Sequence, residues 1–257
     1  MPMPDHLRRA LCGAACLFLA LGPARADLAD TVARVKPSVV LVGTYLATDN
    51  PRFRLRGTGF LVGQGNEVVT NAHVLPAEAT ATDPALVVQV RSPGGQWQMR
   101  EATLLARDNP RDLALLRMAG PPGPPLVVGD SASVREGHEL VFTGFPIGGV
   151  LGFSPVTHRA MVASITEAVL PSPSADRLQP QAIRGLRDGS FTIFQLDGTA
   201  YPGNSGGPLY HPQTGEVMGV INMVLVKSTR EAALSAPSGI SYAIPSVHVK
   251  ELMERAK

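Results

Sequence analysis

Short runs of β-branched and other apolar residues, separated by glycine and charged residues, set the character of this chain. Before residue 120 these runs are Val39–Thr44, Gly59–Val62, Val68–Thr70, Leu86–Val90 and Ala114–Met118. Each run has the length of a single strand, and no helix-length apolar period lies between them. The first half of the chain is therefore expected to form a small β-barrel or sandwich.

A proline-rich segment, Gly120-Pro-Pro-Gly-Pro-Pro125, interrupts this pattern. Proline lacks a backbone donor and cannot continue a helix or a central strand, so we interpret residues 120–125 as a linker. The sequence thus predicts two all-β lobes, at residues 27–119 and 126–245. The strand pattern of the second lobe is carried by Leu140–Thr143, Arg159–Ile165, Phe191–Gln195, Pro208–Tyr210, Val217–Met223 and Ser241–Ile244.

A short helix is expected at each end of the pair of lobes. Residues 27–36 place apolar side chains at spacings of four and three, and Pro37 ends the pattern. Residues 246–257 carry an apolar stripe with helical spacing, and Ser246 is the expected N-cap. The predicted architecture is therefore all-β with short N- and C-terminal helices.

The first 26 residues have the features of a secretory signal. Arg8 and Arg9 precede an uncharged stretch, and Ala24-Arg25-Ala26 matches the A-x-A cleavage pattern. The uncharged stretch is shorter than the roughly 20 residues that span a bilayer, so we expect cleavage after Ala26 and not an anchor. The mature protein is expected to begin at Asp27, to have no membrane span and to be periplasmic or secreted.

The signal segment contains both cysteines of the chain, Cys12 and Cys16. A chain without them has no disulfide, no thiolate metal site and no cysteine nucleophile. A lipid-modified Cys16 is the alternative, although Gly13-Ala14-Ala15 is a poor lipobox. Removal of the signal also leaves 20 basic and 20 acidic residues. That balance argues against nucleic acid or an anionic membrane surface as a partner.

The segment Gly203–Leu209 reads Gly-Asn-Ser-Gly-Gly-Pro-Leu and has the composition of a catalytic turn. Glycines on both sides of Ser205 let the backbone turn sharply, so that the amides of Gly203 and Ser205 can point at one spot. A hydroxyl beside two converging amides supplies a nucleophile and an oxyanion hole for acyl transfer. On these residues alone, an ordinary glycine–serine turn between strands is the alternative.

Two further segments each place a candidate catalytic side chain next to a strand. His73 follows the run Val69-Thr70-Asn71, and Asp112 precedes the apolar run Leu113–Leu116. Asp108, four residues upstream of Asp112, is a rival carboxylate. The remaining histidines have no comparable setting and are interpreted as structural or solvated: His6, His138, His158, His211 and His248.

Taken together, the motifs T-N-A-H-V, D-L-A-L-L and P-G-N-S-G-G-P-L resemble the three catalytic motifs of the chymotrypsin-fold serine proteases, in particular those of the HtrA-type branch. The resemblance covers residues 29–245, almost the whole of the expected mature chain. It implies two six-stranded antiparallel β-barrels of the chymotrypsin type. It implies neither a cofactor nor a metal ion.

The resemblance also assigns roles to the candidate residues. It implies that His73 is the general base, that Asp112 orients it and that Ser205 is the nucleophile. The amides of Gly203 and Ser205 are implied as the oxyanion hole. Asp112 is preferred to Asp108 because the family's aspartate directly precedes a Leu-Ala or Ile-Ala pair.

Three features depart from that family. The chain ends 12 residues after Pro245, so no PDZ domain is expected after the protease lobes. Tyr201 stands where the family has a small or amide residue. The segment Pro171–Asp188 is longer than the corresponding loop of most relatives, and we expect it to gate access to the active site or to position the neighbouring segment Asp197–Pro202. The sequence leaves the regulation and the oligomeric state open, and a homo-oligomer is one of the open alternatives.

The resemblance also locates a substrate pocket. Thr199, six residues before the nucleophile, is expected at its floor. Its wall is expected to contain Asn222, Met223, Val224 and Gly239. None of these residues is charged, so the expected substrates are polypeptides cleaved after small or medium apolar residues. The sequence thus predicts a serine endopeptidase; a protease-fold binding or chaperone-like module without turnover is the alternative.

Overall fold

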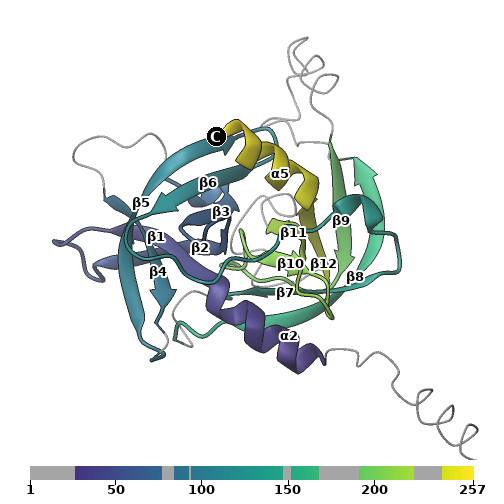
Figure 1. Cartoon of the computed structure of the whole chain (residues 1–257), viewed down its shortest axis with the longest axis horizontal. Coiled ribbons are helices and arrows are strands. Elements are labelled where there is room, and N and C mark those ends of the chain that lie inside the picture. Colours follow the sequence, from purple (N-terminus) through teal and green to yellow (C-terminus); the bar gives the residue numbers. More distant parts are fainter. Residues whose placement is uncertain (1–26, 77–83, 93, 147–151, 168–190, 223–238) are drawn as a thin grey trace, which may run out of the picture.

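Two closed β-barrels form the body of the computed structural model, which describes residues 27–76, 84–92, 94–146, 152–167, 191–222 and 239–257 (Figure 1). The first barrel contains β1 (Val39–Tyr45), β2 (Phe53–Val62), β3 (Glu67–Asn71), β4 (Ala85–Arg91), β5 (Trp97–Asp108) and β6 (Leu113–Met118). The second contains β7 (Glu139–Gly144), β8 (Val156–Glu167), β9 (Thr192–Asp197), β10 (Pro208–Tyr210), β11 (Val217–Asn222) and β12 (Ile240–Pro245).

The strand order closes each barrel. It is β1-β2-β3-β6-β5-β4 in the first barrel and β10-β11-β12-β9-β8-β7 in the second. The neighbouring strands pair antiparallel, for example β3 with β6 and β9 with β12. The predicted pair of six-stranded antiparallel barrels is therefore confirmed.

Each barrel encloses its own apolar core, because alternate side chains of a strand point to the same face. The core of the first barrel includes Val40, Val42, Leu61, Val68, Val88 and Leu116. The core of the second includes Leu140, Phe142, Val162, Phe194, Leu196 and Ile221.

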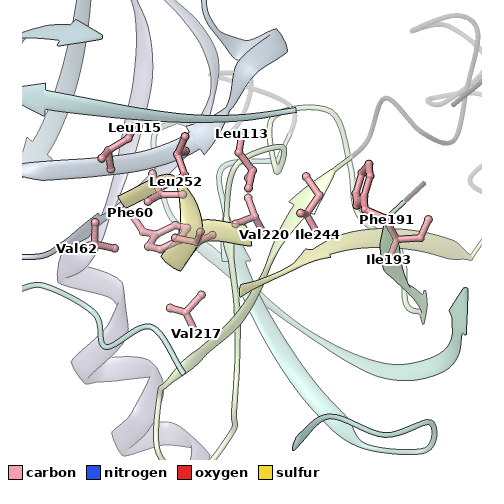
Figure 2. Close-up of a cluster of buried hydrophobic side chains, with 12 residues drawn as sticks. Phe60, Val62, Leu113, Leu115, Phe191, Ile193, Val217, Val220, Ile244 and Leu252 are labelled. Carbon is pink, nitrogen blue, oxygen red and sulfur yellow. The ribbon is translucent and has the colours of Figure 1, made fainter. Parts of the chain in front are cut away.

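A third apolar cluster joins the two barrels to each other, and most of its side chains are labelled in Figure 2. The C-terminal helix α5 (Ser246–Arg255) contributes Val249 and Leu252 to it. The first barrel contributes Phe60, Val62, Val69, Leu113 and Leu115, and the second contributes Phe191, Ile193, Val217, Val220 and Ile244. Because these side chains are almost completely buried, the barrels are held in one relative position by continuous packing.

The two helices lie where the sequence predicts them. The N-terminal helix α2 (Leu28–Val35) buries Val35 in a cluster with side chains of β1, β7 and β10. The expected N-cap role of Ser246 is wrong. Pro245 occupies the N-cap position of α5, and the Ser246 hydroxyl instead donates to the carbonyl of Gly129 at 2.9 Å. Neither α2 nor α5 nor any other described helix has the length and apolar character that a membrane crossing requires.

Strand β5 is the element that the sequence analysis did not predict. Most of its twelve side chains are at least partly exposed. Polar residues therefore interrupt the apolar ones, and no apolar run indicates a strand here. A register shift between Leu104 and Ala106 also interrupts its pairing with β6. Without this strand the first barrel could not close, since β5 links β4 to β6.

The proline-rich segment follows the surface of the first barrel. The amide of Gly123 donates to Gly65 at 2.9 Å, and the amide of Leu126 donates to Leu61 at 2.8 Å. These bonds fix the path of the chain from one barrel to the other. The lobe boundaries at 119, 126 and 245 stay a prediction. The expected signal at 1–26 and the segment Pro171–Asp188 lie outside the described residues.

An ion-pair cluster around Asp108 ties α5 to the end of β5. The Asp108 carboxylate is buried and accepts from Arg255 Nη2 at 2.5 Å and from Arg111 Nη1 at 3.1 Å. Burial by itself raises the pKa of Asp108, but the hydrogen bonds from Arg255 and Arg111 outweigh it and bring the pKa below its ordinary value of 3.8. A carboxyl with a lowered folded-state pKa stabilises the fold at higher pH, and this contribution is lost as the pH falls through that pKa.

We expect Asp108→Asn to lower the free energy of unfolding by about 1–3 kcal/mol at neutral pH, because the charged acceptor of two arginine hydrogen bonds is removed. The difference from wild type should shrink below about pH 4, where the carboxyl of the unfolded wild-type chain takes up a proton, and it should be lost as the pH falls through the lowered folded-state pKa. Urea unfolding of both proteins from about pH 3 to pH 7 measures this difference. A difference that stays constant over the whole range contradicts the ion-pair explanation.

Candidate active site

The pairing of β3 with β6 brings His73 and Asp112 together. His73 lies in the single 3₁₀ turn η2 (Ala72–Val74) directly after β3, and Asp112 directly precedes β6. Asn71 and Leu113 are opposite each other in the strand register. The side chains therefore meet, with His73 Nδ1 at 2.5 Å from Asp112 Oδ2 and the His73 amide donating to Asp112 Oδ1 at 2.8 Å.

The backbone at Asp112 holds its carboxylate in place. Asp112 has a φ of 52°, in the left-handed region that only aspartate, asparagine and glycine adopt readily. Its carbonyl accepts from the Ala72 amide at 3.0 Å and from Asn71 Nδ2 at 2.9 Å. A non-glycine residue in this region costs about 1–3 kcal/mol and persists only where its surroundings hold it, as these two bonds do here.

Asn222 gives the carboxylate a third donor. Its Nδ2 donates to Asp112 Oδ2 at 2.7 Å, and Asn222 is almost completely buried. Sequence reasoning placed Asn222 in the pocket wall and missed this contact. Because an ionised carboxylate can only accept, a neutral His73 ring facing it carries its proton on Nδ1 and keeps the lone pair on Nε2.

Ser205 lies in a pair of consecutive reverse turns before β10. The Asn204 amide donates to Tyr201 at 2.9 Å, and the Gly207 amide donates to the Asn204 carbonyl at 2.9 Å. The third residue of each turn is a glycine with positive φ, 103° at Gly203 and 86° at Gly206. Only glycine takes up such angles without strain, so the sequence Gly-Asn-Ser-Gly builds this doubly turned backbone.

The Ser205 turn packs against the first barrel beside the segment that carries His73. A Cβ atom on Gly206 would collide with the Thr58 carbonyl and the Thr70 hydroxyl. A Cβ atom on Gly57 would lie 2.6 Å from Val74 Cγ2 and 2.9 Å from the Ser205 carbonyl oxygen. The absence of side chains at these glycines therefore allows the serine turn of one barrel to approach η2 of the other.

Two of the predicted pocket residues lie at the same end of the β9–β12 pair. The Gly198 amide, next to Thr199, donates to the Gly239 carbonyl at 2.9 Å. Thr199 and Gly239 are both partly exposed. The buried Ser241 hydroxyl, which sequence reasoning missed, donates to Gly198 at 2.6 Å and accepts from the Ala200 amide at 2.8 Å. Met223 and Val224 lie outside the described residues.

The rival carboxylate and two other histidines have different surroundings. Asp108 pairs with arginines at α5, as described above. His158 stacks on Phe142 with ring centroids 4.8 Å apart, and burial lowers the pKa of His158. Burial likewise lowers the pKa of His248, which faces Glu251 in α5. Tyr201, which stands where the resembled family has a small or amide residue, lies near His158. The centroids of the two rings are 6.2 Å apart.

Comparisons with known proteins find relatives over most of the chain. A family model described as a trypsin-like peptidase domain matches residues 57–220. The mitochondrial serine protease HTRA2 of Bos taurus is 32% identical over 234 residues, which make up 90% of this chain and 43% of that protein. Serine protease HTRA3 of Rattus norvegicus is 30% identical over 233 residues, 88% of this chain and 43% of that protein. The chain thus spans less than half the length of these curated relatives.

A solved structure of an HtrA-type protease with a tripeptide shares the fold. It superimposes with a TM-score of 0.61 at 23% identity, over 89% of this chain and 63% of that one. The observed barrels therefore have the chymotrypsin-type arrangement that the sequence predicts.

Proposed function

This chain belongs to the trypsin-like peptidase family and is homologous to the HtrA serine proteases, and on that premise we propose that it is a serine endopeptidase acting through an acyl-enzyme on Ser205. One observation carries the proposal: His73 is bonded to Asp112 on the first barrel, and the Ser205 turn of the second barrel packs beside it. Histidine, carboxylate and serine brought together from separate segments are the parts that acyl transfer needs.

The hydrogen bonds between His73 and Asp112 support the proposed mechanism. His73 Nε2 takes the hydroxyl proton as Ser205 Oγ attacks the peptide carbonyl, and the imidazolium then protonates the leaving amine. Asp112 holds the Nδ1 proton in place and stabilises the positive charge on the ring. Water then repeats the attack on the acyl-enzyme, with His73 again as the base.

The amides of Gly203 and Ser205 are proposed as the oxyanion hole. The Asn204 carbonyl accepts from Gly207 inside the turn. In a trans peptide the N–H points opposite to the C=O, so the Ser205 amide on the same peptide points away from Gly207. Among the described residues, the Gly203 amide has no backbone acceptor. The direction of the Ser205 amide and the position of Gly203 in the same turn support these two amides as the donors to a developing oxyanion.

We propose that the enzyme cleaves after small or medium apolar residues in unfolded chains. Thr199 and Gly239 lie at the same end of the β9–β12 pair and carry no charge, so these described residues of the pocket offer no partner for a lysine, arginine or glutamate side chain. Burying such a charge unpaired costs several kcal/mol.

Profiling with a peptide library should therefore show dominant cleavage after Ala, Val or Leu. The preference should be graded, because one methylene group in an apolar pocket discriminates by only ~1–3 kcal/mol. Dominant cleavage after Arg, Lys or Glu contradicts the pocket assignment.

We further propose that the protein is exported to the periplasm or the outside of the cell after removal of residues 1–26. The support is the pattern Ala24-Arg25-Ala26 after an uncharged stretch. Intact-mass measurement of the exported protein should give a chain that begins at Asp27 and contains no cysteine. A retained Cys16 carrying lipid contradicts both the cleavage site and the proposed location.

A further inference from the structure

Thr58 in β2 lies between the barrels and is completely buried. Its amide donates to the Ser205 carbonyl at 2.8 Å, and its hydroxyl donates to the Gly203 carbonyl at 2.6 Å. The same hydroxyl accepts from the Phe145 amide at 3.1 Å. One residue of the first barrel thus holds carbonyls on both sides of Asn204 in the second.

The directions of these bonds are fixed by chemistry. A backbone N–H can only donate and a carbonyl can only accept, so the Thr58 hydroxyl accepts from Phe145 and gives its one proton to Gly203. Only threonine or serine supplies a donor and an acceptor in a group this small. Valine has the same shape as threonine and supplies neither.

The Gly203 carbonyl needs an external restraint. With no side chain and a φ of 103°, Gly203 can rotate more freely than any other residue type. Rotation about its backbone bonds would turn the amide that is proposed to bind the oxyanion. The hydroxyl bond from Thr58 limits that rotation, and the amide bond from Thr58 to Ser205 fixes the other end of the segment.

Thr58 is also linked to the strand that leads to His73. The Thr70 hydroxyl donates to the Thr58 carbonyl at 2.7 Å. Thr70 lies in β3, three residues before His73. A single residue therefore aligns the serine turn with the strand that presents the histidine.

We propose that Thr58 is a positioning residue that sets the geometry of the oxyanion-binding turn through the Gly203 carbonyl. The proposal rests on the function proposed above. It assigns a role to a residue that touches neither the substrate nor the general base. Its effect should therefore appear in kcat and not in KM, because the oxyanion forms only during the reaction.

The test compares Thr58→Val with Thr58→Ser, using Thr143→Val as a matched control. Thr143 is equally buried, but its hydroxyl bonds the side chains of Thr157 and Tyr210 and not the serine turn. Thr58→Val should lower kcat on a peptide substrate by about 10- to 100-fold with KM within about twofold of wild type. Thr58→Ser should keep kcat within about threefold, since it restores the hydroxyl.

The control separates positioning from simple loss of stability. Thr143→Val should lower the thermal midpoint, as Thr58→Val does, but it should leave kcat within about threefold of wild type. Given an active wild type, an unchanged kcat in Thr58→Val overturns the proposal, and so does an equal loss of kcat in Thr143→Val.

Hydrogen exchange tests the same restraint independently of activity. The amides of Asn204 and Gly207 close the two turns around Ser205, and in Thr58→Val they should exchange at least about tenfold faster than in wild type or Thr58→Ser. If the wild type itself shows neither hydrolysis nor active-site labelling, the proposed function fails while this measurement still decides the role of Thr58. Equal exchange rates in wild type and Thr58→Val overturn that role.

Discussion

Replacing Ser205 with alanine is expected to abolish peptide hydrolysis while the fold remains intact. Loss of the nucleophile in a triad of this kind lowers kcat on the order of a millionfold. The stability should change by only about 1 kcal/mol, because alanine keeps the carbonyl bond to the Thr58 amide and removes one hydroxyl. The thermal midpoint should therefore stay within a few degrees of wild type.

Steady-state kinetics on a fluorogenic peptide with alanine or valine at the cleaved position measures this loss. Ser133→Ala is a suitable control, because Ser133 is an exposed serine in η3 (Ser131–Ser133) whose hydroxyl donates to the Asp130 carbonyl of its own turn. It should retain wild-type kcat. Activity in Ser205→Ala close to that of wild type contradicts the assignment of the nucleophile.

Asp112→Asn is expected to lower kcat by about four orders of magnitude with the fold preserved. Three donors converge on the carboxylate, from the His73 amide, His73 Nδ1 and Asn222 Nδ2. An amide has one acceptor oxygen and one donor nitrogen, so at least one donor must face another donor. If the amide nitrogen faces the histidine ring, Nδ1 must accept and the proton moves to Nε2, where it blocks the general base. The negative charge that stabilises the imidazolium is lost as well.

The matched control is Asp108→Asn, which makes the same chemical change at the rival carboxylate. Asparagine adopts the left-handed backbone region at least as readily as aspartate, so Asp112→Asn should not distort the turn before β6. Kinetics measured at a temperature where both variants are folded should show near wild-type kcat for Asp108→Asn. A larger loss in Asp108→Asn than in Asp112→Asn contradicts the choice of the orienting carboxylate.

The two-barrel fold could be predicted because most strands are buried and leave a visible apolar run. Eleven of the twelve strands overlap such a run, whereas the largely exposed β5 left no signal of this kind. The N-cap of α5 was misplaced by one residue because the Ser246 hydroxyl has a tertiary partner, Gly129, that local sequence does not reveal. Local patterns thus identify elements better than they identify the bonds between elements.

The same limit holds for the site. The motifs around His73, Asp112 and Ser205 could be identified through their resemblance to a family. The supporting contacts depend on which strands become neighbours. Asn222 reaches Asp112 from the end of β11, and Thr58 reaches the serine turn from β2. These partners are separated by more than a hundred residues, so no local spacing indicates them.

Labelling with a fluorophosphonate tests the central claim most directly, because the reagent reacts only with a serine that is activated for acyl transfer. The purified wild-type protein should be modified at Ser205, and Ser205→Ala should not be modified at all. Mass spectrometry of the digested protein locates the adduct. A folded wild-type protein that remains unlabelled, like Ser205→Ala, contradicts the account and favours a protease-fold binding module without turnover.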